Sequence, residues 1–108
     1  MSLDSLVANP GRLRILTALA AESRMEFVPL RHATRMTDGN LSCHAKRLHA
    51  GGLVAIDKQF RAGKPVTAYR LTDAGRRALR RHVDAVMAAM TPAATVEAEA
   101  TQDEEWVD

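Results

Sequence analysis

The side chains that could do chemistry gather in one short stretch of this 108-residue chain, between residues 37 and 54. Hydrogen-bonding groups and cations recur there, and our candidate residues are Asn40, Ser42, Cys43, His44, Lys46 and Arg47. An asparagine amide can form two hydrogen bonds with adenine, and an arginine guanidinium can form two with guanine. Lysine and arginine also neutralise phosphates. The stretch therefore carries residue types that contact a DNA duplex.

These side chains need a rigid element to hold them, and the spacing predicts a helix over residues 38–50. Thr37 or Asp38 can accept a hydrogen bond from a free N–H of the first turn, and Gly51-Gly52 allows a left-handed end. One apolar stripe recurs at helical spacing: Leu41, Ala45 and Leu48. Most candidates fall on the opposite side, with Ser42 and His44 on the flanks. A solvated surface helix has the same pattern, so the neighbouring elements decide between the two interpretations.

A core helix is predicted near the start of the chain. Asn9-Pro10 is a cap followed by a proline suited to a first helical turn. The apolar residues that follow, including Ala20, form a wide stripe, which predicts a buried helix over residues 10–21. Residues 25–28 are expected to be short and extended.

A second, shorter helix is expected over residues 29–35. Its spacing places Leu30 and Ala33 inward and Arg35 outward, where Arg35 is a further candidate for contact with phosphate. The turn-prone residues 36–39 then lead into the helix that carries most candidates. Two short helices joined by a polar turn are typical of the helix-turn-helix motif.

The periodicity then changes from helical to alternating, which predicts two strands, residues 53–60 and 66–71. The residues between them, 61–65, include a turn glycine and a proline, so an antiparallel hairpin is expected. Arg61 and Lys64 lie at its tip, where we expect them to contact phosphates. A plain hairpin with solubilising charges has the same pattern, but the position directly after a helix-turn-helix favours a wing.

A long helix is predicted over residues 73–90, with Thr72 as its cap. At 1.5 Å per residue it spans about 27 Å, which is more than a core this small needs. It either folds back on the core or pairs with a second chain, and we expect a homodimer. The predicted dimer interface joins this helix to an N-terminal apolar patch: Leu3, Leu6, Val7, Leu79, Val83, Val86, Met87 and Met90.

Charge is divided unevenly along the chain. Residues 1–90 contain all 15 Lys and Arg but only seven acids, a net charge of +8. The other six acids lie in residues 91–108, which have few large apolar groups and are expected to form a flexible acidic tail. A strongly basic domain is typical of proteins that bind polyanions. The tail could fold over the basic face and compete with DNA, or it could be idle.

Other functions find little support. His32, His44, His49 and His82 do not combine with Cys43 at metal-ligand spacing, so no metal or other cofactor is expected. No nucleophile–base set, paired carboxylates or glycine-rich phosphate loop appears, so we do not expect an enzyme. Cys43 could oxidise in a basic environment, but we interpret it as a small neutral groove residue.

The compartment is expected to be the cytoplasm. No apolar run reaches the ~20 residues of a membrane-spanning helix, so no membrane partner is expected. The first residues lack the basic and apolar regions of a secretory signal. A single cysteine cannot form a disulfide within the chain, which suits a reducing compartment.

The order of these elements resembles the compact bacterial winged helix-turn-helix transcriptional regulators related to the MarR and ArsR groups. The likeness covers about residues 9–90 and is most specific in two runs: Asp38-Gly39-Asn40-Leu41-Ser42 with His44, Leu48 and Gly52-Leu53-Val54, and Tyr69-Arg70-Leu71-Thr72 with Gly75. It implies an α+β, mostly helical fold with a three-helix core, a two-stranded wing and a long C-terminal helix. Ala45 and Gly51 stand where such proteins commonly carry larger residues, so looser packing of the helix is expected.

The resemblance also implies a homodimer on double-stranded DNA, with residues 38–50 in the major groove and the wing along the backbone or minor groove. We therefore expect a sequence-specific transcriptional regulator, a repressor in our interpretation, acting on a near-palindromic operator. The alternative is a winged-helix module that binds a protein partner without reading DNA. No pattern in the chain identifies an operator sequence or an effector.

Overall fold

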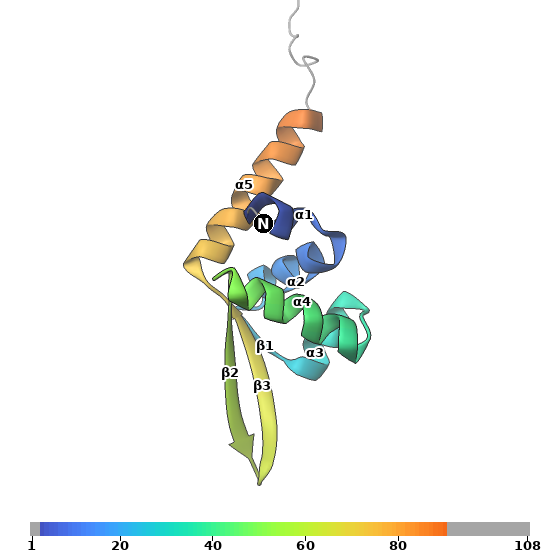
Figure 1. Cartoon of the computed structure of the whole chain (residues 1–108), viewed down its shortest axis with the longest axis vertical. Coiled ribbons are helices and arrows are strands. Elements are labelled where there is room, and N and C mark those ends of the chain that lie inside the picture. Colours follow the sequence, from blue (N-terminus) through green and yellow to red (C-terminus); the bar gives the residue numbers. More distant parts are fainter. Residues whose placement is uncertain (1–2, 91–108) are drawn as a thin grey trace, which may run out of the picture.

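The computed structural model describes residues 3–90 of the chain, with side chains from Ser5 onward. Its elements follow in the order α1 (Leu3–Ala8), α2 (Pro10–Ala21), β1 (Arg24–Glu26), α3 (Phe27–Thr34), α4 (Asp38–Ala50), β2 (Val54–Arg61), β3 (Lys64–Leu71) and α5 (Asp73–Met90). The helices α2, α3 and α4 form a body from which β2 and β3 project as a wing, and α5 extends toward the other end of the molecule (Figure 1). This arrangement confirms the expected α+β winged helix-turn-helix.

Helix α2 lies in the core of the body. The Asn9 side chain accepts a hydrogen bond from the backbone N–H of Arg12 at 3.1 Å, so the predicted cap does start the helix. Its fully buried apolar side chains are Ile15, Leu16 and Leu19. They belong to one apolar cluster with residues of α4 and the sheet. Ala20, which the periodicity placed in the buried stripe, is exposed.

Helix α3 begins earlier than the sequence predicted. Phe27 and Val28, which were expected to be extended, already belong to it, and Pro29 lies in its first turn. A proline there costs no hydrogen bond, because the first N–H groups of a helix have no partner within it. Ala33 is exposed rather than inward, and Thr34 is buried instead. The Thr34 hydroxyl donates to the carbonyl of residue 30 at 2.8 Å, which satisfies it in the core.

The sheet has the strand order β1-β3-β2, and both pairings are antiparallel. Ala62 and Gly63 form the hairpin turn with φ angles of 54° and 77°. Two positive φ angles in a two-residue loop are the requirement of a type I′ turn, whose twist matches that of paired strands. The strands therefore extend nearer to the tip than predicted, since β2 ends at Arg61 and β3 begins at Lys64.

Helix α1 packs against α2 and α5, and its Leu6 also reaches Gly51 at the end of α4. Leu6 and Val7 are buried, at 6% and 1% exposure. Gly51 leaves room for this contact, because a Cβ there would lie 2.6 Å from Cδ1 of Leu6. Ala45 is only 1% exposed within the same apolar cluster. The looser packing that we expected is therefore wrong at Gly51, because the absence of a side chain there lets Leu6 approach closely.

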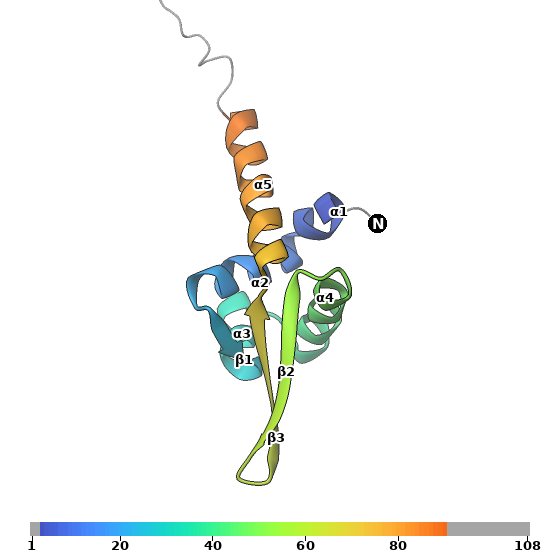
Figure 2. The same cartoon turned by 90° about the vertical axis from the view of Figure 1, so that its left-hand side faces the viewer.

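Thr72 joins the wing to α5 through three hydrogen bonds. Its N–H donates to the carbonyl of Leu53 at 3.1 Å, and its hydroxyl donates to the carbonyl of Gly52 at 2.7 Å. The same hydroxyl accepts from the N–H of Gly75 at 2.9 Å, which confirms Thr72 as the helix cap. Gly75 lies so close to the Leu53 carbonyl that a Cβ at this position would overlap it. These four residues, the Thr72 joint, connect the segment after α4 to the start of α5. The end of α4, the base of the wing and the start of α5 lie close together in Figure 2.

Candidate nucleic-acid interface

Helix α4 presents its polar side to solvent. The Thr37 hydroxyl accepts a hydrogen bond from the N–H of Asn40 at 3.2 Å, so Thr37 rather than Asp38 is the cap. The apolar stripe is buried as expected: Leu41, Ala45 and Leu48. Four candidates are exposed, namely Asn40, Cys43, Lys46 and Arg47, whereas Ser42 and His44 are half-buried on the flanks. The helical spacing thus predicted the orientation of all six.

A shallow groove of about 190 Å³ runs between α4 and the sheet. Its lining residues are Phe27 of α3, Ser42, Ala45 and Lys46 of α4, and Ile56, Lys58, Thr67 and Tyr69 of the two wing strands. Lys46 and Lys58 therefore bring positive charge to both walls of the groove. Our sequence reasoning missed Lys58. The alternation of side chains along a strand could have identified it, because Lys58 shares a face with Ile56, a residue packed against the core.

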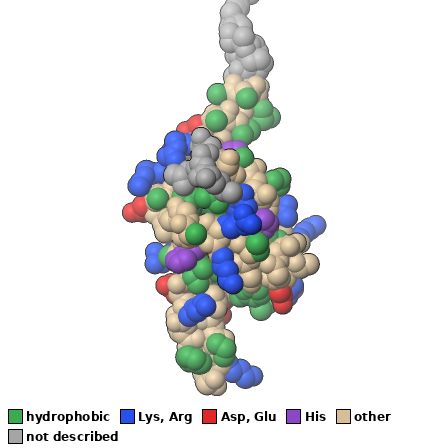
Figure 3. Space-filling model, viewed as in Figure 1, with side chains coloured by type: hydrophobic (Ala, Val, Ile, Leu, Met, Phe, Trp, Pro, Cys, Tyr) green, Lys and Arg blue, Asp and Glu red, His purple; other side chains and the backbone are tan. Residues whose placement is uncertain are grey.

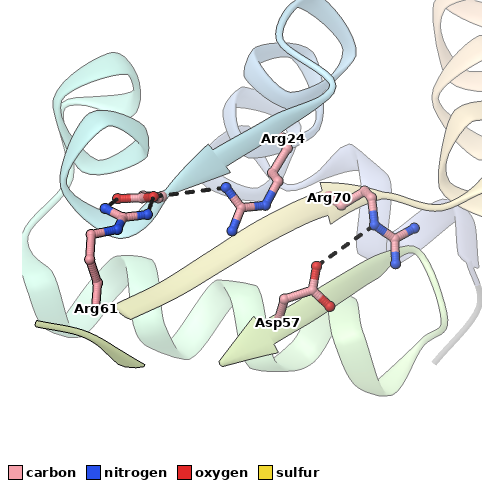
Figure 4. Close-up of polar contacts among 5 residues, drawn as sticks. Arg24, Asp57, Arg61 and Arg70 are labelled. Atoms are coloured by element: carbon pink, nitrogen blue, oxygen red, sulfur yellow. Dashed lines mark hydrogen bonds and ion pairs between the residues drawn. The ribbon is translucent and has the colours of Figure 1, made fainter. Parts of the chain in front are cut away.

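The opposite face of the sheet carries a set of ion pairs (Figure 4). Arg61 donates two hydrogen bonds to the Glu26 carboxylate, at 3.2 and 2.6 Å, and Arg24 lies 3.8 Å from the same group. Arg70 lies 3.8 Å from Asp57. The hydrogen bonds from Arg61 lower the pKa of Glu26. Arg61, which we expected to contact phosphates, is therefore engaged by a carboxylate on the side of the sheet away from α4.

Two other predicted phosphate contacts are exposed. Lys64 lies at the tip of the wing, and Arg35 lies in the turn after α3 with a φ of 58°. Arg31 has a different environment, because its Nε forms an ion pair with Asp38 at 2.9 Å across the turn between α3 and α4. Lys64 is the cross-strand partner of Arg61, so it lies on the same face of the sheet as Arg61, away from α4.

A buried arginine lies beside α4. The Nε of Arg12 donates to the carbonyl of Leu6 at 2.8 Å, and its Nη1 lies 3.4 Å from Nδ1 of His44. Burial, reinforced by the charges of Arg12 and neighbouring arginines, lowers the pKa of His44. His44 therefore connects α4 to the first two helices. Our sequence reasoning did not find Arg12, since arginine is rarely buried and nothing local indicates its partners.

The outer part of α5 leaves apolar side chains exposed: Val83 at 43%, Val86 at 42%, Met87 at 59% and Met90 at 73%. Hydrophobic side chains are visible along this part of the helix in Figure 3. Leu6, Val7 and Leu79, which we also assigned to a dimer interface, are buried in the core of the single chain and offer no exposed contact surface. The side chain of Leu3 lies outside the described residues.

The remaining predictions concern metals, oxidation and the tail. Within residues 3–90, no three His, Cys, Asp or Glu side chains lie together as a metal ion would require. In the same part of the chain, no helix combines the length and apolar character needed to cross a bilayer. Cys43 is a free, exposed thiol. The predicted acidic tail, residues 91–108, lies outside the described residues.

Comparison with known proteins gives this arrangement a family. The family described as "Winged helix DNA-binding domain" matches residues 12–90. An uncharacterized protein of Methanocaldococcus jannaschii is 33% identical over 72 residues, which cover 67% of this chain and 78% of that protein.

Solved structures agree with this match. A "transcriptional regulator homologue protein" from Pyrococcus horikoshii has a TM-score of 0.74 and 29% identity, and the alignment covers 80% of this chain and 85% of that one. A MarR family transcriptional regulator from Silicibacter pomeroyi shares the fold, with a TM-score of 0.59, 24% identity and coverage of 82% and 60%. The similar proteins include archaeal ones, so the likeness is not confined to bacterial regulators. The chain belongs to the family of winged helix DNA-binding domains.

Proposed function

We propose that the protein is a sequence-specific regulator that binds double-stranded DNA through α4 and the wing. The observation that carries the proposal is the groove between them, which is lined by two exposed lysines, Lys46 of α4 and Lys58 of β2. A major groove admits a helix of this kind, and the two lysines lie where they can neutralise phosphates on either side.

We assign roles to the residues on this side by their chemistry. Asn40 and Arg47 carry groups that can pair with two atoms of a base edge, so they are our base-reading residues. Ser42 and Cys43 have short side chains, so we place them close to the floor of the DNA major groove. Phosphate contacts are assigned to Lys46, Lys58 and Arg35. Lys64 is the cross-strand partner of Arg61 and lies on the other face of the sheet, so it is not assigned to this side. His44 supports α4 from within the protein, next to Arg12.

The test starts with selection of bound sequences from a random pool of duplexes by the purified full-length protein. Affinity for the selected duplex is then measured over a range of salt concentrations. We expect a log–log slope of several units, since each neutralised phosphate contributes about −0.9. A winged-helix module that binds only a protein partner would select no sequence and show no such slope.

Two arginine variants then locate the interface. Arg47→Ala is expected to lower the affinity for the selected duplex by about tenfold or more, because a lost pair of hydrogen bonds to a base is worth about 1–3 kcal/mol. Arg81→Ala removes the same charge from α5, far from α4, and is expected to change the affinity less than twofold. Equal losses in both variants would contradict the assignment.

We further propose a homodimer on a near-palindromic operator. The support is the apolar stripe at Val83, Val86, Met87 and Met90, which is adjacent to a small apolar groove against α2. A dimer with twofold symmetry presents two copies of α4, which requires two half-sites about one helical turn, or ~34 Å, apart.

Repression is our proposal for the direction of regulation, and the cytoplasm for the compartment, because the target is DNA. A dimer seated on an operator excludes other proteins from the same grooves. The selected site placed within a reporter promoter tests this, since repression predicts lower reporter output when the protein is expressed and no change with Arg47→Ala.

A further inference from the structure

The wing exposes a large aromatic side chain close to its tip. Phe60 is 76% exposed, the largest exposed fraction among the large hydrophobic residues between residues 5 and 90. Hydrophobic side chains are visible near the end of the wing in Figure 3. An exposed phenylalanine adds nothing to the core, and its transfer from water to an apolar contact is favourable.

The strand register shows which way Phe60 points. Side chains of a strand alternate between the two faces, so Phe60 lies on the same face as Lys58 and Ile56. Both of those residues line the groove beside α4. Phe60 is two residues farther along β2, which places it about 7 Å beyond Lys58 toward the tip. It thus continues the surface that we assign to DNA.

The residue opposite Phe60 on the neighbouring strand is also apolar. Phe60 is paired with Pro65 in β3, directly next to the pair that closes the turn, Arg61 and Lys64. In a hairpin with a two-residue loop the closing pair is hydrogen-bonded, so the next pair is not, and its side chains approach most closely. The last pair of side chains before the turn on this face is therefore apolar, whereas Arg61 is held by Glu26 on the other face.

We propose that Phe60, backed by Pro65, inserts into the minor groove of the duplex whose major groove holds α4, and partly unstacks a base step there. Apolar wedges of this kind unstack base steps and bend the duplex when they enter a minor groove. The binding free energy then depends on how easily the base step unstacks, and pyrimidine–purine steps unstack most easily. The wing then contributes to specificity without a hydrogen bond to a base. This inference rests on the proposed function.

The experiment uses the full-length protein and the duplex selected by the wild type, with 2-aminopurine replacing in turn each adenine under the wing. We expect one position to become brighter when wild-type protein binds, because unstacking relieves quenching. Phe60→Ala is expected to abolish this signal and to lower the affinity about tenfold, with the salt dependence unchanged because no phosphate contact is lost. Phe60→Leu keeps apolar bulk and is expected to retain most of the affinity.

Gln59→Ala is the matched control, since Gln59 is exposed on the opposite face of the same strand. It is expected to bind like the wild type. A wild-type complex without any brighter position, or a Phe60→Ala variant with wild-type affinity, would overturn the inference and would indicate that Phe60 serves another partner. Failure of the wild type to select any duplex would instead overturn the proposed function itself.

Discussion

At the residue scale, Lys58 and Arg61 stand three positions apart on one strand and face opposite sides of the sheet. Lys58 lines the groove beside α4, and Arg61 is bound to Glu26. We predict that Lys58→Ala weakens DNA binding and reduces the slope of the salt dependence by about one, as expected for one lost phosphate contact. Arg61→Ala is the control of equal charge, and we expect its affinity to stay within about twofold of the wild type. Titrations of the selected duplex at several salt concentrations measure both, and a larger loss with Arg61→Ala would contradict the orientation of the wing.

His44 gives the protein a dependence of stability on pH. Its pKa in the folded state is lowered by burial and by nearby arginines, so the unfolded chain binds a proton more readily than the folded one. The stability that depends on neutral His44 is complete above the ordinary histidine pKa of about 6.5 and decreases as the pH falls through the lower folded value. We expect the urea concentration at the unfolding midpoint to decrease as the pH is lowered from 7.5 to 5.5.

His44→Gln keeps a hydrogen-bonding side chain without the titration, so its urea midpoint is expected to fall less over the same pH range. The other three histidines provide a common background in both proteins. Equal decreases in wild type and variant would show that the dependence does not come from His44.

At the element scale, the contact between α5 and the start of the wing depends on the absence of one side chain. A Cβ at Gly75 would overlap the Leu53 carbonyl, which belongs to the backbone and cannot rotate away. We predict that Gly75→Ala lowers the free energy of unfolding by about 3 kcal/mol or more, because α5 must shift to relieve the overlap. Gly39→Ala is the matched control. It lies in the first turn of α4 with open space around it, so we expect a gain of about 0.5 kcal/mol. Urea unfolding of both variants measures the difference.

The elements also show which structures can be predicted from a sequence. Helix caps depend on contacts three residues apart, and Asn9, Thr37 and Thr72 cap the helices as their local patterns indicated. Strand β1 depends on pairing with β3, which lies more than forty residues later in the chain, so its residues showed only that they were extended. The direction in which the Arg61 side chain points could not be predicted either, since its partner, Glu26, lies 35 residues earlier in the chain.

The residues of the candidate site likewise differ in whether local sequence alone predicts them. Helical spacing alone predicted which side chains of α4 are exposed. The place of Lys58 in the site can be predicted only once the register of the hairpin is known. The role of Arg12 can be predicted only once the arrangement of α1, α2 and α4 around it is known. The dimer assignment of Leu6 and Val7 failed because an apolar pattern does not distinguish burial in the protein's own core from burial by a partner.

At the scale of the whole molecule, the exposed stripe on α5 predicts self-association. Val86→Glu places a charge within this stripe, and we expect the dimer dissociation constant to increase about tenfold or more, because an unpaired charge would be buried in the interface. Ala85→Glu adds the same charge one residue earlier, on the opposite side of the helix, and is expected to leave the constant unchanged. Sedimentation equilibrium measures both. Equal self-association of the two variants would show that a different surface forms the dimer.

The charge asymmetry of the chain leads to a second prediction at this scale. Deletion of residues 92–108 removes six acids and leaves a net charge of +8, which includes the exposed arginines of α5, Arg76, Arg77, Arg80 and Arg81. If the tail competes with DNA for basic surface, deletion will tighten binding to a random duplex at low salt and have little effect at high salt. A full-length variant with the six acids replaced by Asn and Gln is expected to behave like the deletion. Unchanged affinity in both would show that the tail is idle.

The Thr72 joint has a consequence for how a bound effector could act. Thr72 caps α5, and two hydrogen bonds and a close backbone contact tie this end of the helix to the segment that follows α4. In the dimer that we propose, a change in the crossing angle of the two α5 helices would therefore rotate each winged-helix body as a unit. The two α4 helices would then separate or approach by an amount that grows with their distance from the crossing point. Half-sites have a fixed separation along the duplex, so a small angular change far from the DNA would be enough to release it.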